Sequence, residues 1–169
     1  MARATRDPRL KRVALAHQAL EAIDKTDFQR RARVLQALWR EDRELPIGSL
    51  AGKPRGAYLA MPFAKESLAS FITPTVQRVV RREVLDPWRS KGKVFKPPRI
   101  FNNLLSSQPL CFNLFGELSE DLALASRVMA DLTGGRVGQV TAVDFEHSPG
   151  RGDPRYTGDK SALDLFISY

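Results

Sequence analysis

Hydrophobic residues recur every three or four positions along three stretches in the first half of the chain. This period is typical of amphipathic helices with one buried face. It predicts three helices, over about 8–23, 27–43 and 74–85. Thr73-Pro74 gives the third helix a clear start, because threonine caps a helix and proline fits its first turn. The prolines and glycines between 46 and 56 should prevent regular structure there.

The helical period continues after residue 100 and then changes. It predicts two further helices, over about 104–115 and 117–132, with Gly116 between them. From residue 137 the helical period is lost, which predicts strands over 137–146 and 162–169. In the second of these, Leu163, Leu165 and Ile167 alternate with Asp164, Phe166 and Ser168. A helical N-terminal part that leads into the beginning of a sheet predicts a mixed α/β (α+β) fold.

Positive and negative charges are divided unevenly along the chain. Residues 1–100 carry 22 Lys and Arg against 10 Asp and Glu, and residues 101–169 carry 5 against 9, within a net charge of +8. We therefore predict a basic, mostly helical region over 1–100 and an acidic region over 101–169, within one continuous domain. This division indicates that one part of the chain binds a polyanion.

Basic side chains of the third helix and of two loops are the candidates for contacts with nucleic acid, whose phosphates attract cations. Trp88 and Phe95 lie among the charges of the loop 88–99 and could stack on exposed bases. In the alternative interpretation, the arginines are solvated faces of amphipathic helices and the two rings belong to the core. The candidate phosphate-binding residues are Arg78, Arg81, Arg82, Lys91, Lys93, Lys96, Arg151, Arg155 and Lys160.

Three carboxylates near the C-terminus are the candidates for a metal site. Asp144 and Glu146 are two apart on a predicted strand, so both should point to one face, and Asp164 lies near the start of the next strand. If the strands are antiparallel neighbours, the three side chains can converge, and oxygen-rich clusters suit Mg²⁺ or Mn²⁺. In the alternative interpretation, Asp144 and Glu146 form the solvent face of an edge strand.

The segments LLSSQPLCFNLFG (104–116) and FEHSPGRGDPRYTGDKSALDLFISY (145–169), with the helix between them, resemble a restriction-endonuclease-like family of the PD-(D/E)xK nuclease superfamily. The resemblance covers roughly 100–169, and the N-terminal part resembles the family only in general character. It implies that 101–169 is part of a nuclease core that hydrolyses phosphodiester bonds of DNA. It also implies that Asp164 and Glu146 are catalytic and bind the metal, with Asp144 the less favoured ligand.

One element of the family pattern does not occur in this sequence. Such nucleases carry an E-x-K motif on the third core strand, and no E-x-K follows Asp164 here. We therefore expect a core that is truncated after its second strand and a chain that does not cleave nucleic acid by itself, because a metal ligand and a lysine are missing.

Two other functions agree with the same residues. One is a non-catalytic nucleic-acid-binding protein that keeps the basic surface without the chemistry. The other is an assembly protein whose open sheet edge is completed by a partner chain or a second copy. A cytoplasmic protein without a membrane partner is expected, because the sequence has no apolar run long enough for a bilayer, no secretory signal and a single cysteine, Cys111.

Overall fold

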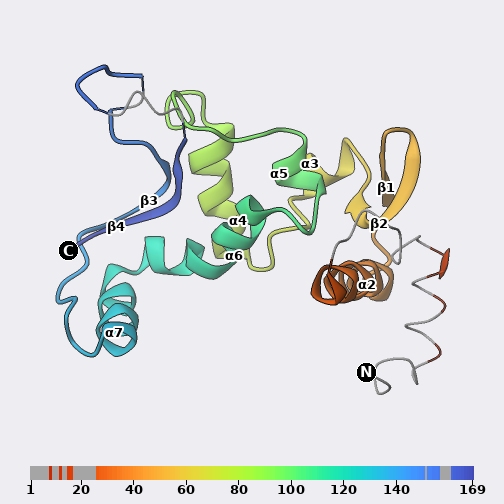
Figure 1. Ribbon diagram of the computed structural model, residues 1–169, viewed down its shortest axis with the longest axis horizontal. Coiled ribbons are helices and arrows are strands. Elements are labelled where there is room, and N and C mark those ends of the chain that lie inside the picture. Colours follow the sequence, from red (N-terminus) through yellow and green to blue (C-terminus); the bar gives the residue numbers. More distant parts are fainter. Residues whose placement is uncertain (1–7, 9–11, 13–14, 17–25, 151, 157–160) are drawn as a thin grey trace. The chain divides into compact units, whose positions relative to one another are not determined.

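The computed structural model describes residues 8, 12, 15–16, 26–150, 152–156 and 161–169 (Figure 1). These residues form two compact units. The first unit contains the described residues up to Ser70 together with Pro97–Ser106, and the second contains Phe71–Lys96 together with the described residues from Ser107 onward. No helix in the described part is long and apolar enough to cross a membrane. Most of the helix predicted over 8–23 lies outside the described residues.

The first unit is built on helix α2 and a β-hairpin. Helix α2 (Asp27–Asp42) confirms the helix predicted over 27–43, and Thr26 and Gln29 form a capping box at its start. The buried side chain of Arg40 donates from Nε to the carbonyl of Gly56 at 3.0 Å and from Nη1 to that of Leu45 at 2.8 Å. An arginine of the helix therefore satisfies backbone carbonyls in and beside the hairpin.

The hairpin contradicts the expectation that 46–56 has no regular structure. Strands β1 (Ile47–Leu50) and β2 (Lys53–Leu59) are antiparallel, and Ala51 and Gly52 connect them with φ values of 50° and 76°. Two positive φ values in a two-residue loop match the twist of paired strands. The glycine that was expected to interrupt structure is therefore a turn residue. Two short helices complete this unit, α3 (Phe63–Ser67) and α5 (Arg99–Asn102).

The second unit begins with the helix predicted over 74–85. The structure has an α-helix, α4 (Pro74–Val80), followed by a π-helical turn, η1 (Arg81–Leu85). Thr73 caps α4, since its side chain accepts a hydrogen bond from the Val76 backbone N–H at 3.1 Å. The predicted extent and start of this helix are confirmed.

The predicted helix break at Gly116 is wrong. Helix α6 (Ser107–Glu120) runs through this glycine, and the chain breaks at Asp121, which caps helix α7 (Leu122–Thr133). A Cβ atom at Gly116 would lie 3.0 Å from Cγ2 of Val76 on α4. The glycine therefore leaves room for the close approach of α4 and α6, which lie side by side in Figure 1.

A two-stranded antiparallel sheet completes the second unit, formed by β3 (Ala142–His147) and β4 (Leu163–Ser168). β3 begins five residues later than predicted, because Val137 and Val140 pack with Leu118 and Ala125 in an apolar cluster instead of extending the strand. Phe112 of α6 stacks on Phe145 of β3 with ring centroids 4.1 Å apart. Helices and sheets in the described residues confirm the mixed α/β class, while the division of charge at residue 100 stays a prediction.

Candidate functional site

Helix α6 contacts both strands of the second unit, at Glu146 on β3 and at Asp164 on β4, the two residues that are the favoured metal ligands. Gln108 and Cys111 lie about one turn apart on this helix. The Gln108 amide donates from Nε2 to Oε1 of Glu146 at 2.6 Å, and the Cys111 thiol donates to the backbone carbonyl of Asp164 at 3.3 Å. One helix face therefore lies against Glu146 on β3 and Asp164 on β4.

The strand register brings the same two residues together. Phe145 pairs with Leu165 and His147 pairs with Leu163, so Glu146 lies between two paired residues and Asp164 lies between their partners. Glu146 has a φ of 51°, outside the range of a strand, and this interrupts the alternation of side chains. Consecutive residues of β3, Phe145 and Glu146, are consequently both buried, with exposed fractions of 1% and 7%.

Burial of Glu146 contradicts the interpretation of this carboxylate as part of a solvent face. A solvent-facing residue of an edge strand would be exposed, whereas Glu146 is buried and bonded to a buried amide. Asp164, in contrast, is exposed. Burial raises the pKa of the Cys111 thiol to about 12, and the negative charges of Asp164 and Glu146 add to the effect.

The predicted convergence of three carboxylates is not seen. Asp144 pairs with Phe166, farther along the ladder, and within the ranges that the structure describes no group of three His, Cys, Asp or Glu residues could hold a metal ion. The two carboxylates beside α6 still fit a hard cation in number and chemistry, because Mg²⁺ is commonly bound by one or two carboxylates and keeps several waters. Glu146 and Asp164 thus offer two carboxylates, the kind of ligand that a hard cation takes.

Gln108 is a functional candidate that the sequence analysis missed. Its buried amide bonds to three partners at once: Nε2 donates to the Val94 carbonyl at 3.0 Å as well as to Glu146, and Oε1 accepts from the Lys96 backbone N–H at 3.2 Å. A polar residue directly before the apolar run 109–112 was the available signal. Its partners come from distant parts of the sequence, and only the fold brings them together.

Several candidate phosphate-binding side chains are already engaged in ion pairs. Buried Glu83 of η1 accepts from Lys93 Nζ at 2.8 Å and from Arg82 Nε at 2.9 Å, and Arg82 also pairs with Glu120. Burial alone would raise the pKa of Glu83, but the hydrogen bonds from Lys93 and Arg82 outweigh it and lower the pKa. Arg82 and Lys93 therefore have a structural role in the second unit.

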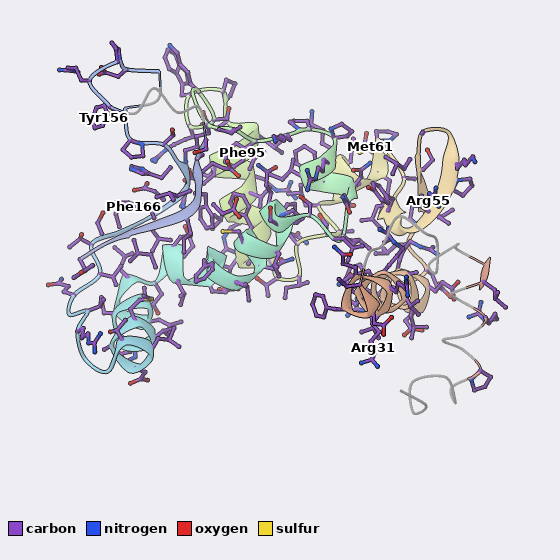
Figure 2. All side chains as sticks on the ribbon, in the orientation of Figure 1. Arg31, Arg55, Met61, Phe95, Tyr156 and Phe166 are labelled. Atoms are coloured by element: carbon purple, nitrogen blue, oxygen red, sulfur yellow. The ribbon has the colours of Figure 1, made fainter. Side chains whose placement is uncertain are left out.

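The other cations differ in surroundings. Arg155 pairs with Asp153 at 2.7 Å on the β3–β4 connection, where Tyr156 is labelled in Figure 2. Two candidates, Arg151 and Lys160, lie outside the described residues. The remaining four are exposed, namely Arg78, Arg81, Lys91 and Lys96.

The structure also separates the two aromatic residues of the basic loop. Phe95 packs against Phe112 with ring centroids 5.9 Å apart, so it belongs to the core of the second unit. Trp88 is 84% exposed. Only Trp88 has the ring surface available that stacking on a base requires.

Comparison with known proteins gives one family. A family model of the PD-(D/E)XK nuclease superfamily matches residues 22–169. No curated protein and no solved structure gives a significant match. The matched range includes α6, both strands of the second unit and the two carboxylates beside the helix.

Proposed function

Since this chain belongs to the PD-(D/E)XK nuclease superfamily, we propose that it serves metal-dependent hydrolysis of phosphodiester bonds in DNA. Glu146 and Asp164 are the catalytic carboxylates and bind Mg²⁺ or Mn²⁺. The surroundings of Glu146 support this proposal most strongly. Glu146 is buried, fixed by Gln108, and lies in the strand register across from Asp164.

The chain's own residues prepare this site in two ways. Gln108 orients the Glu146 carboxylate through a hydrogen bond between buried groups, and Cys111 fixes the backbone of β4 at Asp164. A divalent ion bound by these carboxylates would polarise a phosphoryl oxygen and lower the pKa of a bound water. The exposed side chains of Arg78, Arg81, Lys91 and Lys96 are proposed to contact phosphates of the substrate.

In the family that the sequence resembles, hydrolysis also uses groups on a third core strand. The family resemblance implies an E-x-K motif beyond the second core strand, and none follows Asp164 in this sequence. We therefore expect the 169-residue polypeptide to bind the divalent ion and DNA without cleaving DNA. Cleavage of DNA in Mg²⁺ by the purified polypeptide, abolished by Asp164→Ala, would show that this expectation is wrong.

Thermal unfolding in increasing Mg²⁺ tests the metal site. An ion that binds only the folded protein stabilises it by about 2.7 kcal/mol at a hundred times its dissociation constant. We expect Tm to rise with Mg²⁺ in the wild type and to respond much less in Glu146→Gln and Asp164→Asn. Asp131→Asn is the matched control, because Asp131 is an exposed residue of α7 and the charge change is the same.

Two outcomes would count against the proposal. An equal response in Asp164→Asn and the wild type would place the ion elsewhere. DNA binding without any response to Mg²⁺ or Mn²⁺ would favour the non-catalytic nucleic-acid-binding protein.

A further inference from the structure

The loop that follows η1 is fixed by its own hydrogen bonds. The Asp86 carboxylate accepts from the backbone N–H groups of Trp88 at 2.8 Å and Arg89 at 3.2 Å, and its backbone carbonyl accepts from Ser90 at 3.0 Å. The Lys93 N–H then donates to the carbonyl of Ser90 at 3.1 Å. Two linked turns therefore set the backbone from Asp86 to Lys93.

Both ends of this loop are attached to the second unit. Lys93, at the far end, forms the ion pair with buried Glu83 just before the loop begins. Two residues later Phe95 enters the core against Phe112. The loop is thus a short closed segment whose position is set by a buried ion pair and by aromatic packing.

The side chains at the tip of this loop remain exposed. Trp88 is 84% exposed, although an indole gains more than most side chains from burial. Arg89 and Lys91 are also exposed, and neither forms an ion pair with any residue in the described ranges. The tip therefore presents an exposed aromatic ring followed in the chain by two exposed cations that form no ion pair in the described ranges.

We propose that Trp88 stacks on an unpaired nucleobase while Arg89 and Lys91 contact the neighbouring phosphates. The partner is thus a single-stranded or locally unpaired segment of nucleic acid. The bases of a closed duplex are already stacked on one another, whereas an unpaired base has a face available for an indole. This inference rests on the proposed function only in taking nucleic acid as the partner, and it adds which form is recognised.

Fluorescence quenching measures this contact directly. The chain has two tryptophans, and Trp39→Phe leaves Trp88 as the only indole. Oligothymidylate and a duplex of equal length are titrated into this variant, with vesicles of anionic lipid as a third ligand. We expect oligothymidylate to quench Trp88 emission, and the duplex and the vesicles to leave it nearly unchanged.

Substitutions at the tip separate stacking from charge. Trp88→Leu keeps an apolar side chain without a ring face and should weaken binding of oligothymidylate by about 5- to 100-fold with an unchanged salt dependence. Arg89→Gln and Lys91→Gln should each lower the slope of log affinity against log salt by about 0.7. Arg136→Gln is the matched control, because Arg136 is an exposed cation of the same unit away from the loop, and it should have no effect.

The outcomes distinguish this inference from the proposed function. Two results would overturn only the proposal that Trp88 stacks on an unpaired base. One is binding of oligothymidylate that Trp88→Leu leaves unchanged, and the other is equal quenching by the duplex. Quenching by vesicles and not by nucleic acid would assign the tip to a lipid surface. Failure to bind any nucleic acid would overturn both proposals, whereas a missing response to Mg²⁺ with intact stacking would overturn only the catalytic one.

Discussion

Gln108 links three parts of the second unit through one side chain. Its amide bonds to the loop carbonyl of Val94, the backbone N–H of Lys96 and the carboxylate of Glu146. If the Gln108 amide were removed, each of these partners would lose a hydrogen bond, and water would not easily replace it because the site is buried. The residue therefore fixes both a candidate catalytic carboxylate and the end of the basic loop.

Gln108→Met tests this role, because methionine is similar in length and cannot donate. We expect a loss of about 1–3 kcal/mol in the free energy of unfolding, the penalty for unsatisfied buried groups. Urea denaturation measures it. Gln139→Met is the control, since Gln139 is exposed. A loss at Gln108 no larger than at Gln139 would mean that the amide has no structural role.

The ion pair of Glu83 predicts a dependence of stability on pH. The folded protein holds the pKa of Glu83 below its ordinary value of 4.5, so the unfolded state binds the proton more tightly. The stabilisation is therefore complete above about pH 4.5 and is lost as pH falls through the lower pKa of the folded state. Glu83→Gln should cost about 2 kcal/mol at pH 7 and progressively less below pH 4.5. Urea denaturation of both proteins between pH 3 and 7 would contradict this if the difference did not change with pH.

At the scale of elements, the close approach of α4 and α6 depends on Gly116. Alanine favours a helix over glycine by about 1 kcal/mol, so an exposed Gly→Ala change in a helix would stabilise the protein. Here the new methyl group would lie 3.0 Å from Cγ2 of buried Val76. We expect Gly116→Ala to destabilise the protein by about 1–2 kcal/mol.

A double-mutant cycle identifies the cause. Val76→Ala removes the side chain that the new methyl group meets, so the double variant should lose less stability than the sum of the two single variants. Additive losses would show that Gly116 is not limited by this contact. Thermal or urea unfolding of the four proteins gives the comparison.

Most elements could be predicted from hydrophobic periodicity, and the errors share a cause. Glycine and proline often interrupt regular structure, yet Gly52 forms the turn of a hairpin and Gly116 allows two helices to touch. Which role a glycine has depends on contacts with residues distant in sequence. The apolar Val137 and Val140 similarly cover helices instead of extending β3.

For the molecule as a whole, the sequence indicates which carboxylates are candidates for a site, but not the contacts that hold them. The resemblance and the superfamily match draw attention to the region of Glu146 and Asp164, and the strand register places the two residues across from each other. The positive φ of Glu146 and its bond to Gln108 could not be predicted, because both depend on how α6 packs on the sheet. The same packing separates Phe95, which is half-buried against Phe112, from exposed Trp88.

Glu146 and Asp164 are proposed to bind one divalent ion together. Electron paramagnetic resonance of free Mn²⁺ tests it most directly, because the signal falls as the ion binds the protein. We expect the wild type and Asp131→Asn to bind Mn²⁺ alike, and Glu146→Gln and Asp164→Asn to bind it at least about tenfold more weakly. Equal Mn²⁺ binding by all four proteins would contradict the claim.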